Sequence, residues 1–285
     1  MSAQTARLLI SCPDARGIVA AVSGFIAQQD GNILDADQHT DPDHGEFFMR
    51  VEVDRRGLRL GPETFAAAWG PLAERFGMRW RIYWGDRVKR MAIFASRQSH
   101  CLNDLLWRWR TGELRVELAL VISNHPELRA DAEACGAPFH HLPLTPETKA
   151  AQEDAAEALL DQHGVDFIVL ARYMQVLSPA FVARYENRLI NIHHSFLPAF
   201  AGPRPYHQAY DRGVKIIGAT SHYVTDQLDQ GPIIAQGTLP VNHRDTIDDL
   251  VRKGRDLERI VLASAVRLHV EDKILVSRNK TVVFD

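Results

Sequence analysis

Short apolar runs alternate with helical stretches from residue 91 onward, and this alternation constrains the fold more than any other feature. Four of these runs are strand candidates, at residues 91–96, 116–123, 167–170 and 189–193. Between them, apolar residues recur at helical spacing, and a long helix is predicted over residues 246–269. Strands that alternate with helices favour an α/β fold, in which a doubly wound, mostly parallel sheet carries helices on both faces.

The first part of the chain has a different order of elements. Strand-like runs and helical stretches follow one another as β-α-β-β-α-β, the order of a ferredoxin-like α+β domain. A chain of 285 residues is long enough for about two domains. We therefore predict a first domain at residues 1–84, a polar linker at residues 85–89 and a second domain at residues 90–285.

Composition excludes several classes of protein. The chain has 33 Lys and Arg against 36 Asp and Glu, so it lacks the strong positive field that binds nucleic acid or an anionic membrane. No apolar run is long enough to span a membrane, and the N-terminus does not read as a secretory signal. The cysteines are odd in number and widely spaced, without zinc-ligand spacing: Cys12, Cys101 and Cys135. We expect a cytoplasmic protein without a metal.

Two polar side chains interrupt the apolar strand at residues 189–193. Side chains two residues apart on a strand point to the same face, so Asn191 and His193 lie together while Ile190 and Ile192 pack on the other side. The strand must end before Pro198, because proline cannot continue a central ladder. The carboxyl ends of parallel strands are where open α/β sheets bind ligands. The pattern favours a functional site over two satisfied polar groups at a strand end, but only modestly.

A second polar stretch follows at residues 215–236. His222 lies on its first strand candidate, and Asp226 and Asp229 lie in the tight turn before the next one. Carboxylates in a turn are usually turn chemistry, so these two alone do not indicate a site.

Together the two stretches resemble the catalytic core of the folate-dependent formyltransferase family. The matching motifs are NIHxSxLP and SHYVTDQLDQGPIIAQ, and residues 171–179 resemble the loop of that family that borders the folate. The resemblance covers about residues 91–236. It implies that 10-formyltetrahydrofolate is the substrate and that Asn191, His193 and Asp229 are the catalytic residues.

The resemblance also places the folate ring between the loop at 172–177 and the turn at 225–229. His222 would orient Asp229 or simply close a strand. The residues that it implies for binding the substrate or shaping the site are Arg172, Met174, Val176, Leu177, His194, Ser195, His222, Asp226 and His100.

Departures from the transferase pattern favour the deformylase branch of this family. Residues 96–102 contain no glycine where the transferases of glycinamide ribonucleotide hold a phosphate with a Gly-Ser-Asn loop. His194 stands where those transferases have proline. The resemblance then implies that water replaces the amine and that the products are tetrahydrofolate and formate, with no cofactor beyond the substrate. The alternatives are a formyltransferase that uses an amine acceptor such as glycinamide ribonucleotide, and a non-catalytic amino-acid sensor.

The expected mechanism divides three tasks among the three catalytic residues. Asp229 acts as a base for water, either directly or through His193. Asn191 and His193 supply N–H groups to the developing oxyanion. Either His193 or a water molecule protonates the departing nitrogen.

The first domain resembles an ACT domain, because the motif D-x-x-G-[LI] appears at residues 14–18 beside the ferredoxin-like order. Asp14 is the expected N-cap of the following helix. The resemblance implies an amino-acid effector, glycine or methionine, near Asp14, Gly17 and Ile18, and pairing into a homo-oligomer, dimer or tetramer. A plain docking or dimerisation domain would show the same capped helix.

Overall fold

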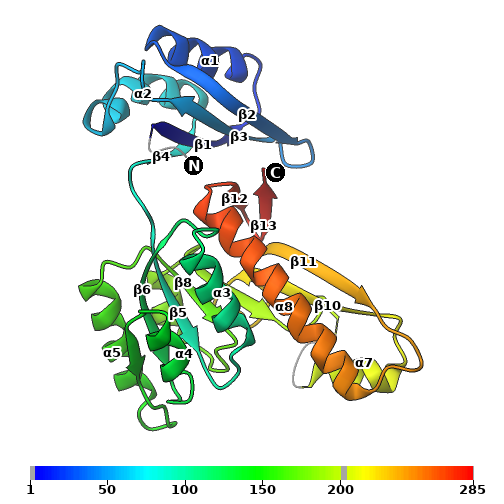
Figure 1. Ribbon diagram of the computed structural model, residues 1–285. Helices are drawn as coiled ribbons and strands as arrows, with labels where there is room; N and C mark the ends of the chain where they lie inside the picture. The colour runs from blue at the N-terminus through cyan, green and yellow to red at the C-terminus, as the bar shows by residue number, and fades with distance from the viewer. Residues whose placement is uncertain (1–3, 200–203, 285) are drawn as a thin grey trace. The chain divides into compact units, whose positions relative to one another are not determined.

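The computed structural model describes residues 4–199 and 204–284 (Figure 1). The chain divides into two compact units, one made of Met1–Val88, Glu271–Ser277 and Val282–Asp285, the other of Lys89–Val270 and Arg278–Thr281. The predicted second domain ran to residue 285, whereas most of the last fifteen residues belong to the first unit. The sequence pattern does not show which unit the terminal residues join, because the side chains of a terminal hairpin follow the same pattern whichever unit it packs against.

The first unit is an antiparallel four-stranded sheet of order β2-β3-β1-β4, and its ferredoxin-like chain order confirms the prediction. Its elements are β1 (Thr5–Pro13), α1 (Ile18–Gln28), β2 (Asn32–Asp41), β3 (Glu46–Asp54), α2 (Pro62–Phe76) and β4 (Arg79–Trp84).

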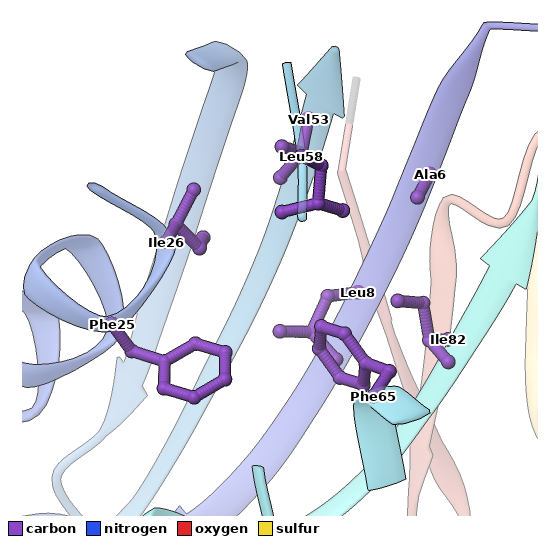
Figure 2. A pocket seen from close by; sticks show the side chains of 8 residues that line it. All are labelled: Ala6, Leu8, Phe25, Ile26, Val53, Leu58, Phe65 and Ile82. Carbon is purple, nitrogen blue, oxygen red and sulfur yellow. The ribbon is translucent and has the colours of Figure 1, made fainter. Parts of the chain in front are cut away.

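The apolar sides of α1 and α2 pack against the sheet of the first unit. Trp69 on α2 is fully buried, and its ring makes edge contacts with Phe25 of α1. Figure 2 shows Phe25, Ile26 and Phe65 around a small apolar cavity of about 10 Å³. That volume is about what one water molecule requires, so this interior is packed core.

Helix α1 begins differently from the prediction. Its N-cap is Gly17, with φ of 88°, and Asp14 is not the cap. The backbone N–H of Asp14 instead donates to the carbonyl of Gly45 at 2.8 Å, which ties this loop to the β2–β3 turn. Glycine suits the cap because a positive φ is strained for residues with a Cβ.

The second unit is a seven-stranded sheet of order β11-β10-β9-β8-β5-β6-β7, in which β9 to β7 are parallel and β10 and β11 antiparallel. This confirms the mostly parallel sheet. Its elements are β5 (Arg90–Ala95), α3 (His100–Arg110), β6 (Glu117–Ser123), α4 (Arg129–Ala134), β7 (Phe139–His141), α5 (Lys149–Gln162), β8 (Phe167–Ala171), α6 (Pro179–Arg184), β9 (Leu189–His193), α7 (Pro205–Arg212), β10 (Ile216–Tyr223), β11 (Ile233–Pro240) and α8 (Ile247–Val270). A two-stranded sheet of β12 (Ile274–Ser277) and β13 (Lys280–Val283) follows.

The order of the strands brings three chain segments to one edge of the second sheet. β5, β8 and β9 are neighbours and run parallel, so the segments after Ala95, Ala171 and His193 begin at the same edge. Helix α8 packs against β9, β10 and α3 in the same unit (Figure 1). None of the helices in residues 4–199 and 204–284 is long and apolar enough to cross a membrane.

A buried ion pair completes the first unit. Arg7 Nη1 lies 3.0 Å from Asp272 Oδ2, and both side chains are almost fully buried. Arg50 Nε donates to the backbone carbonyl of Asp272 at 3.1 Å, while its Nη1 contacts Asp35 at 2.8 Å. The residues after α8 are therefore part of the structure of this unit.

We predict that Asp272→Asn lowers the free energy of unfolding by about 3 kcal/mol, because it leaves a buried arginine without its counter-charge. Chemical denaturation followed by tryptophan fluorescence measures this change. The control is Glu117→Gln, which removes a partly exposed partner of Arg90 and should change stability by less than about 0.5 kcal/mol. Equal effects of the two substitutions would contradict the prediction.

Candidate active site

The pairing of β9 with β10 places four polar side chains on one face of the sheet. In this antiparallel register His222 lies opposite Asn191 and Thr220 lies opposite His193. Directly opposite residues project from the same face, and Asn191 Nδ2 lies 3.3 Å from His222 Nε2. Ile190 and Ile192 are buried on the other face, as the alternation along this strand predicted.

Asp229 brings its carboxylate to both imidazoles from the turn after β10. Its Oδ2 lies 3.2 Å from His193 Nδ1, and its Oδ1 lies 3.6 Å from His222 Nε2. The backbone of Asp229 is left-handed, with φ of 55°, a conformation that aspartate tolerates better than most residues. The hydrogen bond that His193 donates is the largest cause that holds the pKa of Asp229 well below its ordinary value, and it outweighs the effect of burial. The carboxylate is therefore ionised at neutral pH.

The hydrogen bonds fix which ring nitrogens carry protons. Because a carboxylate only accepts, His193 Nδ1–H donates to Asp229, and Nε2 of the neutral ring is unprotonated. That Nε2 is buried and has no hydrogen-bond partner within residues 4–199 and 204–284. His222 Nδ1–H donates to the carbonyl of Tyr223 at 2.9 Å, so its neutral Nε2 accepts the Asn191 amide. The structure thus brings the three predicted catalytic residues together, and His222, also predicted, contacts both Asn191 and Asp229.

Exposed apolar side chains lie on both predicted folate-binding segments. Met174 and Val176 are 56% and 59% exposed on the loop after β8, and Leu228 is 66% exposed beside Asp229. Sequence reasoning missed Leu228, because a lone leucine among turn residues carries no pattern. Leu177 is largely buried in the core, whereas Asp226 is exposed.

Two residues assigned to the substrate are held within the protein. Ser195 is buried, and its hydroxyl donates to the carbonyl of Ala199 at 2.7 Å, which stabilises the loop after β9. Arg172 is 6% exposed, and its Nε donates to Gln98 at 3.1 Å. Neither side chain presents an open surface to a ligand.

A buried network, here called the Glu258 cluster, consists of Glu258, His100, Arg172 and Tyr206. Glu258 accepts hydrogen bonds from His100 Nε2 at 2.8 Å and from the Tyr206 hydroxyl at 2.6 Å, and Arg172 Nε lies 3.4 Å away. Burial raises the pKa of Glu258, but these partners outweigh it and keep that pKa below its ordinary value. Sequence reasoning missed Glu258, although it falls on the apolar stripe of α8 with Gly254, Leu257, Val261 and Leu262.

Part of this cluster has the residue types of a metal site. Ligand atoms of His100, Cys101 and Glu258 lie within 4.8 Å of one another, the only such group among the described residues. Two features oppose a cation there. The Arg172 guanidinium is already next to Glu258, and burial, followed by the charge of Glu258, raises the pKa of the Cys101 thiol. A metal would need the thiolate.

His194 connects the Glu258 cluster to the catalytic residues. Its ring centroid lies 5.2 Å from that of His193 and 6.0 Å from that of Tyr206. Burial, and next the positive charge of Arg172, lowers the pKa of His194 to about 3. His194 is therefore a neutral imidazole at physiological pH.

In the first unit, the residues assigned to an effector lie in the β1–α1 loop and at the first position of α1. Asp14 and Gly17 are exposed, whereas the side chain of Ile18 is buried in the core. Beside them is an open pocket of about 390 Å³ whose charged residues, Glu46 and Arg79, lie 4.0 Å apart. The residues that line this pocket are Cys12, Pro13, His44, Gly45, Glu46, Gly77 and Arg79.

Comparisons with known proteins agree with both units. The formyl transferase family matches residues 89–266, and the ACT domain family matches residues 6–59. The chain is 56% identical to a formyltetrahydrofolate deformylase of Synechocystis, over 98% of each chain. The chain belongs to the formyltetrahydrofolate deformylase family. A crystal structure of such a deformylase from Pseudomonas syringae is 50% identical, with a TM-score of 0.96 over 99% of this chain and 94% of that chain.

A transferase structure is similar over only part of the chain. Glycinamide ribonucleotide transformylase 1 from Symbiobacterium toebii is 32% identical, with a TM-score of 0.65 over 70% of this chain and 95% of that chain. The deformylase structure thus matches both units of this chain, whereas the transformylase structure, nearly all of which is aligned, matches only about the share of the chain that the second unit occupies.

We predict that His194 makes the folded chain less stable as the pH falls from 6.5 toward 3. The unfolded histidine binds a proton near pH 6.5 and the folded one only near pH 3. Its contribution to stability is therefore complete above pH 6.5 and is lost below it, by at most about 1.4 kcal/mol per pH unit. Urea denaturation at pH 7.5 and 5.0 should show a smaller loss for His194→Asn than for the wild type. The exposed His207, changed to Asn, is the control, and a slope unchanged in His194→Asn would contradict the prediction.

Proposed function

We propose that this chain hydrolyses 10-formyltetrahydrofolate to tetrahydrofolate and formate. The observation that carries the proposal is the Asp229–His193 pair. The carboxylate holds one ring nitrogen and leaves on the other side a buried Nε2 that has no partner among the described residues. This arrangement suits a histidine that takes and returns a proton. It also argues against a non-catalytic sensor, since a plain binding domain does not require such a pair.

His193 is the proposed base for the attacking water. The lowered pKa of Asp229 makes that carboxylate a weak base, so its role is to hold the Nδ1–H and to stabilise the imidazolium that forms. His193 Nε2 takes a proton from water as the oxygen attacks the formyl carbon. It then gives the proton to the nitrogen as the C–N bond breaks.

Asn191 is the proposed donor to the oxyanion. Its amide has two N–H groups, of which one donates to His222 Nε2 and the other is available to the substrate. His222 thus positions Asn191 as well as contacting Asp229. Of the two N–H donors expected from the sequence, the ring N–H of His193 is directed to Asp229 instead of the oxyanion.

The folate ring would lie along the exposed apolar side chains of the two segments that were assigned to it. Met174 and Val176 on one side and Leu228 on the other offer apolar contact to a flat ring. The exposed carboxylate of Asp226 is a candidate partner for the donor edge of the pterin. We propose that the reaction needs neither a metal nor a second cofactor, because the water-activating groups are already present.

A formyltransferase with an amine acceptor is the second candidate. The similarity to a transformylase supports it for the second unit. The residues after β5 favour hydrolysis for two reasons. The Ser96 hydroxyl donates to Asn124 and His100 contacts Glu258, so both side chains already have partners within the protein. Residues 96–102 also contain no glycine that would bring backbone N–H groups close to a phosphate.

We predict that the wild type releases formate from 10-formyltetrahydrofolate without any amine, and does so equally well after treatment with EDTA. Asp229→Asn should reduce kcat by about 10³- to 10⁴-fold, since the imidazolium loses its counter-charge. Asn191→Ala should reduce it by about 100- to 1,000-fold, with a smaller change in KM. Formate release and tetrahydrofolate formation measure the rates. The exposed Asp211, changed to Asn, is the control. Formate release that requires an amine would support the transferase, and full activity in Asp229→Asn would contradict the mechanism.

We also propose that the ACT unit binds glycine or methionine and pairs in a dimer or tetramer. The pocket beside Asp14 presents Glu46 and Arg79, which complement the ammonium and carboxylate groups of a free amino acid. The Ile18 side chain is buried in the core and does not line this pocket.

We predict that calorimetry detects binding of at least one of the two amino acids and that Arg79→Ala weakens it at least tenfold. Arg59→Ala, at an exposed arginine outside the pocket, should bind like the wild type. Light scattering measures the oligomeric state in the same samples. The absence of heat with both amino acids, together with unchanged rates of hydrolysis, would refute the effector.

A further inference from the structure

The turn that carries Asp229 has weak internal support. Gln227 and Leu228 are exposed. The carbonyl of Gln227 accepts long hydrogen bonds from the N–H of Gln230 at 3.2 Å and from the hydroxyl of Thr225 at 3.1 Å. Asp229 itself has a positive φ of 55°, which few residues with a Cβ adopt. An exposed turn of this kind opens locally at a small cost in free energy, so its carboxylate needs support from outside the turn to stay aligned with two imidazoles.

One support is the close contact between residues 230–233 and the end of β10. A Cβ at Gly231 would lie 1.8 Å from the carbonyl oxygen of Tyr223, so only glycine lets the backbone approach this carbonyl. The N–H of Tyr223 donates to the carbonyl of Pro232 at 2.9 Å. The same Tyr223 carbonyl accepts the Nδ1–H of His222. The position of residues 230–233 therefore bears on the hydrogen bond that fixes the proton of His222.

The other support comes from the C-terminal hairpin. Residues Arg278–Thr281, here called the hairpin loop, include the turn between β12 and β13 and belong to the second unit. Asn279 Nδ2 donates to the carbonyl of Gln230 at 2.8 Å, and the Thr281 hydroxyl donates to the carbonyl of Ile233 at 2.6 Å. The two donors thus hold both ends of the stretch that packs on β10, and Gln230 directly follows the catalytic aspartate.

We propose that Asn279 and Thr281 are positioning residues, whose hydrogen bonds keep the carboxylate of Asp229 aligned with both imidazoles. They act through the backbone, because their partners are carbonyl groups. A displaced carboxylate would lose its hold on the Nδ1–H of His193, and small displacements of catalytic groups lower reaction rates strongly. The effect on rate rests on the proposed hydrolysis, whereas the alignment rests on the geometry alone.

The first test removes the two donors. Thr281→Val keeps the shape of the side chain without its hydroxyl, and Asn279→Ala lacks the amide. We expect each substitution to reduce kcat about two- to tenfold and the double variant to reduce it about 10- to 50-fold, as the loss of ordinary hydrogen bonds would. Thr281→Ser retains a hydroxyl and should keep kcat within about twofold of the wild type. Formate release and tetrahydrofolate formation measure kcat.

The matched control is Lys280→Ala, at an exposed lysine between the two donors. It should change kcat by less than about twofold, because surface substitutions without a specific contact have small effects. If the double variant does not fold, Thr281→Val is compared with Thr281→Ser instead. A folded double variant with the kcat of the wild type, or an equal loss in Lys280→Ala, overturns the proposal.

A double-mutant cycle separates alignment from a merely structural role. In the Asp229→Asn background no carboxylate is left to align. Adding Asn279→Ala and Thr281→Val to that background should therefore change kcat by less than about twofold. A loss as large as in the wild-type background would contradict the proposal, because the hairpin loop would then support the fold as a whole.

The alignment is also measured without folate, so the result is separable from the proposed function. Ring ¹⁵N NMR of histidine-labelled protein distinguishes the two nitrogens of His193, whose signals are assigned from their absence in His193→Asn. We expect the proton on Nδ1 in the wild type and shared between both nitrogens in the double variant. Unchanged signals overturn the proposal whatever the rates are. A changed signal, in a protein whose wild type releases no formate, would support the alignment and refute the hydrolysis.

Discussion

The antiparallel pairing of β10 with β9 is the constraint on which the site depends. An otherwise parallel sheet would present Asn191 and His193 alone at the end of β9. Because β10 runs in the opposite direction, His222 stands opposite Asn191, and the turn that follows returns Asp229 to both imidazoles. The register between these two strands therefore fixes the relative positions of two imidazole rings, an amide and a carboxylate. A slip of one residue would turn His222 to the other face of the sheet.

The hydrogen bonds at this pairing also assign the chemical roles. A carbonyl holds one proton of His222 and a carboxylate holds one proton of His193. In each neutral ring, Nε2 is therefore the nitrogen without a proton. The positions of the protons follow because a carbonyl and a carboxylate can only accept hydrogen bonds. The pKa of Asp229 is lowered by the same contacts that orient the rings.

Much of this arrangement could be predicted from local patterns. Period-two alternation placed Asn191 and His193 on one face, and the alternation of strands and helices indicated the sheet. Two short elements were missed: β7 has three residues, and α7 is mostly polar, so neither carries a periodic apolar signal. The N-cap was assigned to Asp14 because its side chain suits caps, whereas the backbone turn at Gly17 decided the start of α1.

Residues that act through distant partners were harder to find. Arg172 looked like a ligand for the substrate because it lies in a matching loop, yet Gln98 and Glu258 hold it inside the protein. Glu258 is separated from Arg172 by 86 positions (258 minus 172) and from His100 by 158, and no local spacing records such contacts. Family resemblance predicted which three residues are catalytic, but the buried charges of the Glu258 cluster could be found only from the fold.

The discontinuity of the first unit has a consequence for biosynthesis. Its strands and helices leave the ribosome first, but the segment that contains Asp272 follows residues 89–270 of the second unit. Arg7 acquires the Asp272 carboxylate only after residues 89–270 of the second unit have been translated. The ACT unit therefore reaches its final form only after most of the second unit has been translated, and a nascent chain stalled before residue 271 carries it unfinished.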